Sequence, residues 1–182
     1  MATLVSDCWA SQLKTEAAQH QLCLAHLLRE LKNFQVALAD KWSFECEALF
    51  KKAIHLKIES KQSNLLNHKQ EVEHILKEFD NLLKVDETGK HKKIKAFIRR
   101  LRKHQASVFT CMLLEDVPYE NNASERAIRN VKTKTKVSGC FRTLSGAQQF
   151  AVIRSVIDTA IKNTKNIFEA LTIIARLEIP AE

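Results

Sequence analysis

The scarcity of chain-breaking residues constrains the fold of this sequence more than any other feature. Its 182 residues contain three glycines and two prolines, the residue types that interrupt helices and supply most tight turns. Long β-meanders need many such turns, so the composition favours a mainly helical protein. The sequence also has no glycine-rich phosphate loop of either common kind, which argues against nucleotide-dependent chemistry.

Apolar residues recur at helical spacing along most of the chain. Such stripes run through residues 24–38, 42–54, 72–83, 94–101, 150–161 and 167–177, with polar residues on the opposite side. The last stripe is expected to bury Ile167, Leu171, Ile174 and Leu177. Residues 115–122 (EDVPYENN) form the clearest loop. At residues 132–137 lysines alternate with threonine and valine, which predicts an extended segment with one basic edge.

Two short apolar runs near the start of the chain are candidate strands. The first, at residues 2–9 (ATLVSDCW), presents Asp7 at its carboxyl end. The second, at residues 20–26 (HQLCLAH), leads directly into the first helix. Short apolar runs are ambiguous between strand and buried helix. Together with the helical stripes they predict a mainly α protein with a small β component.

Positive charge is concentrated in two stretches of a chain whose net charge is +8. Eight Lys or Arg residues and no acid lie between Thr88 and Leu114, and seven more, again with no acid, lie between Arg126 and Ile157. One interpretation is two solvated helix faces. The other is a phosphate-binding surface around a small acidic centre at residues 115–125.

The cysteines and the hydropathy indicate the class of protein. Five cysteines are an odd number, are scattered and accompany no signal peptide, so reduced thiols in a cytoplasmic compartment are expected. No apolar run approaches the roughly 18 residues that a membrane span needs. An integral membrane protein is therefore excluded, and no membrane partner is expected.

Glu125 is a lone acid at the start of the second basic stretch. With Asn122 as N-cap and Glu125 three residues later, the segment is a variant of the capping box. Arg129, four residues further on, is a local partner for the carboxylate. The local pattern alone favours a helix-capping glutamate, whereas the basic setting favours a metal ligand for chemistry on DNA.

Asp7 also has two interpretations, because an acid at a strand end either begins a turn or is displayed in a catalytic crevice. Two carboxylates far apart in sequence, with basic surface between them, are what two-metal phosphoryl transfer requires. Cys23 and His26 form a C-x-x-H pair, which is half of a zinc site, and no second pair follows at suitable spacing. Spacing alone favours a structural cysteine and a histidine at a helix start.

Several blocks of the sequence resemble bacterial insertion-sequence transposases. They are LVSDCW (4–9), HQLCLAHLLREL (20–31), NNASERAIRNVKTKTKVSGCFR (121–142) and GAQQFAVIRSVIDTAIKN (146–163). The match is to the C-terminal part of the catalytic region of the family numbered sixty-six. It covers nearly the whole chain and is densest from Val117 to Leu177, where the Asn-Asn-x-x-Glu-Arg-x-Ile-Arg block is specific.

This resemblance implies a DDE transposase with a truncated ribonuclease H-like α/β fold and a helical insertion. In that family three acids bind a divalent metal, Mg²⁺ or Mn²⁺, cut the DNA at the element's ends and join the 3′-ends to target DNA. Asp7 matches the second acid and Glu125 the third, so both are expected to be catalytic and to bind metal. Residues 1–182 then form a single domain, with the insertion at about 42–103 and the segment that carries the third acid at about 117–182.

The resemblance also implies roles for the residues around the two acids. DNA contact is expected of Arg126, Arg129, Lys132, Lys134, Lys136 and Arg142. Cys23, His26 and Asn122 are expected to support the site. The implied partners are DNA of the element ends and the target, another copy of the chain, or a full-length transposase, in a nucleoid-associated setting.

One departure from the family's pattern matters for activity. The family's first Asp lies on a strand upstream of Met1, and no candidate acid precedes Asp7. The sequence therefore predicts a catalytic-region fragment that binds metal weakly or not at all and is inactive alone. An alternative is a non-catalytic DNA-binding or regulatory truncated transposase that acts through residues 90–103 and 126–142. A third hypothesis is a helical structural protein whose charges only solvate it.

Overall fold

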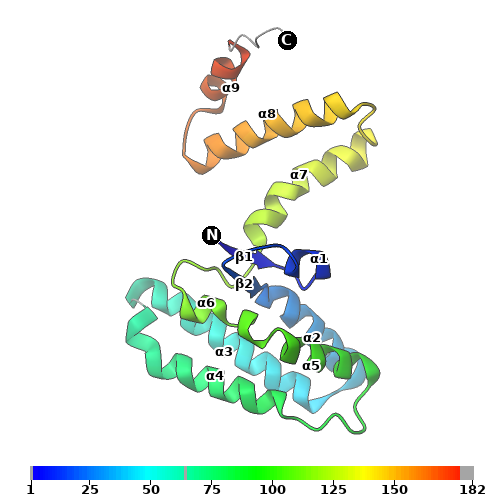
Figure 1. Cartoon of the computed structure of the whole chain (residues 1–182), viewed down its shortest axis with the longest axis vertical. Coiled ribbons are helices and arrows are strands. Elements are labelled where there is room, and N and C mark those ends of the chain that lie inside the picture. Colours follow the sequence, from blue (N-terminus) through cyan, green and yellow to red (C-terminus); the bar gives the residue numbers. More distant parts are fainter. Residues whose placement is uncertain (1, 64, 177–182) are drawn as a thin grey trace. The chain divides into compact units, whose positions relative to one another are not determined.

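The computed structural model describes residues 2–63 and 65–176. The chain divides into two compact units, Met1–Asn121 and Asn122–Glu182. Helices predominate, and the strands of the described residues form one two-stranded sheet (Figure 1). The predicted mainly α composition with a small β component is confirmed. Within the described ranges, no helix combines the length and the apolarity needed to cross a bilayer.

The sheet of the first unit is built from the two predicted strands. Strand β1 (Thr3–Ser6) pairs in parallel with β2 (Gln19–Leu22), so that Ser6 lies opposite Leu22. The short helix α1 (Ala10–Leu13) lies in the connection between them, and β2 leads through Cys23 into α2 (Leu24–Leu38). Because the strands are parallel, their carboxyl ends meet at the same edge of the sheet.

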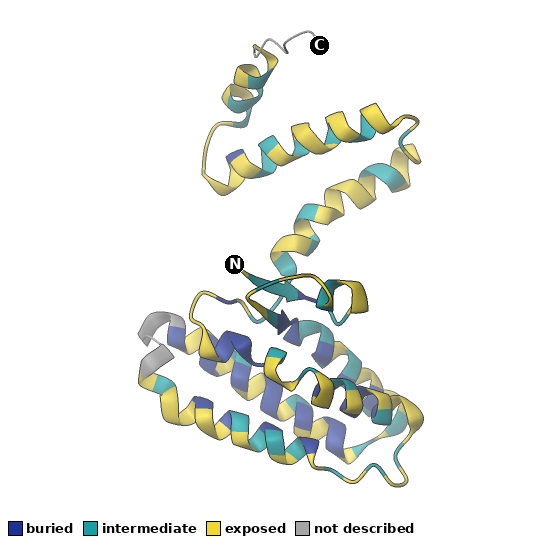
Figure 2. Ribbon diagram, in the orientation of Figure 1, coloured by how far each residue is buried: buried dark blue, intermediate teal, exposed yellow. Residues whose placement is uncertain are grey.

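The other helices of the first unit enclose its core. They are α3 (Lys41–Ser63), the 3₁₀ turn η1 (Leu65–His68), α4 (Lys69–Leu83), α5 (Lys92–Lys103), the 3₁₀ turn η2 (Gln105–Ser107) and α6 (Thr110–Leu113). The buried residues lie on the sides of these helices that face one another (Figure 2). Phe50, Phe79 and Phe109 form a cluster at its centre, with ring centroids 5.0 to 5.9 Å apart. The apolar stripes predicted on the first four helical segments are therefore the core.

The second unit contains α7 (Asn122–Ser138), α8 (Leu144–Lys162) and α9 (Ile167–Ala175). Helix α7 continues through residues 132–137, so the prediction of an extended segment there is wrong. Apart from Val137 the alternating residues are polar on both sides, and such alternation does not define a buried strand face. The hydroxyl groups of Thr133 and Thr135 instead donate to the carbonyl oxygens of Arg129 and Val131, one helical turn earlier.

The burial predicted for the last apolar stripe is found only in part, and the apolar residues of α8 are also less buried than those of the first unit. Among the described residues of this unit, Ala160 alone is fully buried, and Ile153 and Ile161 are about half exposed, at 48% and 53%. On α9 the described members of the predicted stripe are only half-buried. Leu177 lies outside the described residues. Three helices without a second layer from their own unit leave apolar side chains in contact with solvent.

Candidate active site

The carboxyl ends of the two strands bring together two of the predicted site residues. Asp7 directly follows β1, and Cys23 directly follows β2. The Cys23 amide donates to the carbonyl oxygen of Ser6 at 2.8 Å, which extends the strand pairing by one step. Asp7 and Cys23 therefore occupy neighbouring positions at the edge where α/β folds display ligand-binding groups.

Asp7 is half-buried and is oriented by its own turn. The Trp9 amide donates to the Asp7 carbonyl oxygen at 2.5 Å. In the amide orientation that satisfies its hydrogen bonds, Gln12 of α1 donates to the Asp7 carboxylate and, at 3.0 Å, to the Asp7 carbonyl oxygen. A neutral amide donor orients the carboxylate without placing a counter-charge beside it.

The next residue, Cys8, lies among several charged groups. Burial raises the pKa of the Cys8 thiol above its ordinary value, although the nearby Arg100 guanidinium acts in the opposite direction. Arg100 itself forms an ion pair with Glu30 at 2.7 Å. A raised thiol pKa keeps Cys8 protonated at neutral pH, and a protonated thiol is a poor metal ligand. The groups at the end of β1 therefore suit a hard cation held by carboxylate oxygen.

Cys23 and His26 lie at the start of α2. Cys23 is the N-cap residue of the helix and is only 1% exposed, while His26 is half-buried in the first turn. The backbone amide of Asn121 donates to the Cys23 sulfur at 3.3 Å. The Cys23 thiol thus contacts the chain at the last residue of the first unit, one residue before α7 begins.

The segment that leads to Asn121 is attached to β2 by buried polar contacts. Gln21 is fully buried; its amide nitrogen donates to the carbonyl oxygen of Val108 at 2.7 Å, and its amide oxygen accepts from the amide of Cys111 at 2.6 Å. The Thr110 hydroxyl donates to the carbonyl oxygen of His20 at 2.6 Å. These contacts fix residues 108–111 on the strand whose end carries Cys23.

Two further contacts attach the rest of this segment. The Leu24 amide donates to the carbonyl oxygen of Tyr119 at 2.9 Å. From α3, the ammonium group of Lys57, a residue only 2% exposed, donates to the carbonyl oxygens of Leu114 and Glu115 at 2.9 and 2.8 Å. Sequence reasoning did not identify Gln21 or Lys57. A polar residue within an apolar strand or helix was the available signal, but its partners lie 57 to 90 residues away in sequence.

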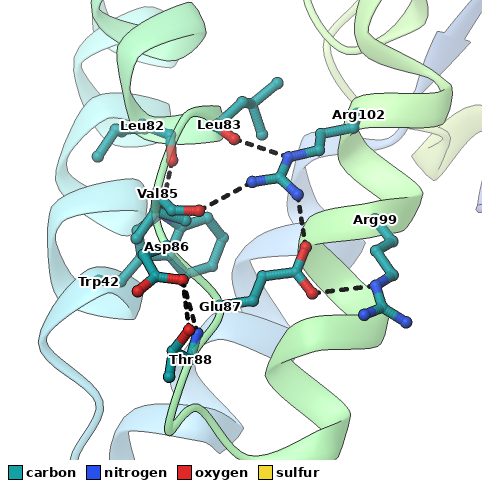
Figure 3. A network of polar contacts seen from close by, with 9 residues as sticks. All are labelled: Trp42, Leu82, Leu83, Val85, Asp86, Glu87, Thr88, Arg99 and Arg102. Carbon is teal, nitrogen blue, oxygen red and sulfur yellow. Dashed lines mark hydrogen bonds and ion pairs between the residues drawn. The ribbon is translucent and has the colours of Figure 1, made fainter.

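The basic residues of α5 are only partly available to a ligand. Figure 3 shows Arg102 beside the end of α4, where its guanidinium donates to the carbonyl oxygens of Leu83 and Val85 at 2.7 and 2.9 Å. Glu87 accepts from Arg102 at 2.5 Å and from Arg99 at 3.0 Å. Arg102 therefore caps the end of α4 and fastens the loop that joins α4 to α5.

Two more cations of this stretch pair with acids of other elements. Arg100 binds Glu30 of α2, and Lys90 binds Asp40 at 2.9 Å, with both side chains of the latter pair less than a fifth exposed. The basic stretch between Thr88 and Leu114 is therefore divided between cations that hold the fold and cations that face solvent.

Glu125 and the other predicted site residues belong to the second unit. Helix α7 begins at Asn122, and Glu125 lies in its first turn, where the helix dipole favours a negative charge. The Arg126 guanidinium contacts the carbonyl oxygen of Asn122 at 3.4 Å. A carboxylate in this position can be both part of a helix N-terminus and a ligand, so the two interpretations of Glu125 are compatible.

The six cations predicted to contact DNA differ in exposure. Arg126, Arg129, Lys132, Lys136 and Arg142 are exposed. Lys134 is half-buried, and its ammonium nitrogen lies 3.7 Å from the centroid of the Phe141 ring, a cation–π geometry. On a helix, Lys132 and Lys136 share one side and Lys134 lies on another. The single basic edge expected from an extended segment is replaced by this helical distribution.

Comparison with known proteins agrees with the resemblance seen in the sequence. The model of the family described as Transposase IS66 family matches residues 1–149. No curated protein and no solved structure matches the chain. The family match takes in β1 with Asp7, β2 with the C-x-x-H pair, the helices α3 to α5, and α7 with Glu125. This chain belongs to the IS66 family of transposases.

Proposed function

We propose that this chain is part of the catalytic region of a DDE transposase, with Asp7 and Glu125 as two of its metal-binding acids. The observation that carries the proposal is the hydrogen bond from Asn121 to the Cys23 sulfur. Cys23 lies next to Asp7 at the carboxyl edge of the sheet, and Asn121 immediately precedes the acid-bearing helix.

The chain itself limits how far Glu125 can lie from this edge. Glu125 is four residues beyond Asn121, and four residues of helix advance by about 6 Å. A carboxylate in the first turn of α7 therefore stays within about 6 Å of Asn121 along the helix axis. The attachments of residues 108–121 through Gln21, Thr110 and Lys57 keep that starting point in place.

The donor groups fit a hard divalent cation. Asp7 offers a carboxylate that is oriented by an amide, and carboxylate oxygen is the ligand that Mg²⁺ and Mn²⁺ prefer. When bound, such a cation supplies an activated water or 3′-hydroxyl and stabilises the leaving oxygen. Asp7 and Glu125 would hold it, and Gln12 would fix the direction of the Asp7 carboxylate.

The cations of α7 would hold the DNA rather than take part in bond cleavage. Arg126, Arg129, Lys132 and Lys136 project from the helix that carries Glu125. Contacts from these side chains to phosphate oxygens would set the position of the scissile bond, since phosphate contacts fix register and carry no sequence information. Removing one of them should weaken binding and reduce its salt dependence.

We also propose that the complete site needs polypeptide outside these 182 residues. Parallel sheets are usually covered on both faces and contain more than two strands, whereas the sheet of the described residues consists of two four-residue strands. A ribonuclease H-like sheet would add strands here, and one of them would carry the first acid. With two acids, the chain by itself should bind metal weakly and lack strand-transfer activity.

The test is cleavage of labelled element-end DNA by the chain joined to the upstream segment that bears the first acid. With Mg²⁺ or Mn²⁺ present, this longer protein should cleave. Asp7→Asn and Glu125→Gln should each abolish cleavage and leave DNA affinity nearly unchanged. Asp116→Asn, at an exposed acid of the preceding loop, is the matched control and should cleave normally. Retained cleavage in Glu125→Gln would overturn the assignment.

A second candidate function is non-catalytic DNA binding, and the exposure of the α7 cations is the observation that favours it. In this function the 182-residue chain would occupy element ends without cutting them. Salt-dependent DNA binding by the chain alone, with no cleavage even after the upstream segment is added, would favour this function over catalysis.

A further inference from the structure

Helix α5 is a basic helix with one apolar side. Its apolar residues Ile94, Phe97, Ile98 and Leu101 are all buried in the core of the first unit. The remaining positions of the helix are mostly Lys or Arg, and its residue range contains no acid. Because the apolar side is anchored in the core, the direction in which the basic side faces is fixed relative to the first unit.

Tertiary contacts divide these cations into two groups. Arg100 and Arg102 pair with Glu30 and Glu87 and are about two-thirds buried, with side-chain exposures of 30% and 38%. Arg99 also contacts Glu87. Hydrogen bonds from Thr88 are the main cause of the lowered pKa of the Asp86 carboxyl, and the charge of Lys95 lowers it further. These cations have acidic neighbours within the unit.

Lys92, Lys93 and Lys103 form the other group. All three are exposed, and within the described ranges no ion pair or hydrogen bond involves their ammonium groups. Lys92 and Lys93 lie in the first turn of α5, which contains no acidic residue. Positive charge at that end of a helix opposes the helix dipole, so these two lysines do not stabilise the helix they belong to.

The spacing of these lysines suits a polyanion. Lys92 and Lys103 are separated by 11 residues, which is about three helical turns and about 16 Å along the axis, and they lie on nearly the same side of the helix. A strand of duplex DNA carries a phosphate for about every 3.4 Å of rise. The outer side of α5 thus spans about five phosphates of one strand.

We propose that Lys92, Lys93 and Lys103 form a second DNA-binding surface, separate from α7, that contacts the phosphate backbone of duplex DNA. This inference rests on the proposed transposase function and assigns α3 to α5 a part in it. Arg100 and Arg102 are not part of the surface, because they hold α5 against α2 and against the end of α4. The surface should bind DNA without regard to sequence.

The test measures the affinity of the 182-residue protein for a fluorescent DNA duplex, by anisotropy, between 50 and 200 mM salt. The triple variant Lys92→Gln, Lys93→Gln, Lys103→Gln removes three phosphate contacts, so the slope of log affinity against log salt should fall by about 2.7. Over this fourfold change in salt, the variant should lose about 40-fold less affinity than the unmodified protein.

The control variant carries Lys14→Gln, Lys69→Gln and Lys77→Gln, which change the net charge equally at exposed lysines of the same unit. Its salt slope should stay close to that of the unmodified protein. An unchanged slope in the α5 variant, an equal fall in the control, or no DNA binding by the unmodified chain at 50 mM salt would each overturn the inference. Thermal unfolding checks the fold, and the α5 variant should unfold at the same temperature or higher.

Failure of this inference can be distinguished from failure of the proposed function. If cleavage depends on Glu125 in the longer protein but the α5 variant keeps its salt slope, the transposase assignment stands and the second surface is wrong. If the α5 variant loses slope while Glu125→Gln still cleaves, the binding surface stands and the assignment of Glu125 is wrong.

Discussion

The contact between Gln21 and the segment at residues 108–111 offers the sharpest test of how the first unit is held together. Gln21→Met replaces the amide by a side chain of similar size and removes its hydrogen bonds. Because volume is nearly conserved, the packing change itself should be small. The carbonyl oxygen of Val108 and the amide of Cys111 would then lose their partners in a buried site.

The magnitude follows from those two groups. A buried polar group left without a hydrogen bond costs about 1–3 kcal/mol, so with two such groups the free energy of unfolding should fall by about 2–6 kcal/mol. Domains of this size are stable by about 5–15 kcal/mol, and the loss is therefore large enough to measure. Because residues 108–121 lead to α7, the same change should also reduce cleavage by the longer protein.

The assay is urea denaturation followed by far-UV circular dichroism, with the midpoint and the slope fitted separately. Gln19→Met is the matched control, since Gln19 lies on the same strand but is exposed, and it should change stability by less than about 0.5 kcal/mol. A loss below about 1 kcal/mol in Gln21→Met, or equal losses in both variants, would refute the reasoning.

Three further predictions follow from individual contacts. Glu87→Gln weakens the pairing with Arg102 and should lower the free energy of unfolding by about 0.5–1.5 kcal/mol in urea denaturation; an unchanged midpoint would contradict this. Burial lowers the pKa of His104, so the unfolded state binds the proton more readily, and stability should fall as the pH drops below about 6.5; His104→Gln should flatten that pH dependence. Cys140 is exposed, whereas burial raises the pKa of Cys111 to about 12, so a thiol reagent should label Cys140 rapidly and Cys111 only after unfolding; equal rates in the folded protein would contradict this.

The sequence by itself determined the elements whose signals are local. The apolar stripes at residues 24–38, 42–54, 72–83 and 94–101 gave the helices of the first unit, because burial of one helix side imposes a period of 3.6 residues. The strand end at Asp7 and the loop before Asn122 were also local patterns. The family resemblance identified Asp7 and the segment that begins at Asn122 from residue identities alone.

Where the sequence misled, the pattern carried no information about burial. The alternating lysines at 132–137 lie within a helix. Their alternation did not predict this, because the charge of a side chain does not show which side of an element is buried. The apolar stripe of α8 fits a helix equally well with or without a partner, so the sequence could not show that Ile153 and Ile161 would remain about half exposed.

Only the tertiary structure decided how each polar residue is used. Along the sequence the cations of α5 look equivalent, yet Arg100 pairs with an acid 70 residues away while Lys92 faces solvent. Gln21 is likewise one glutamine among several until the fold places Val108 and Cys111 beside it. Hydrogen bonds and ion pairs act over a few ångströms in space, and their partners are set by chain folding rather than by sequence separation.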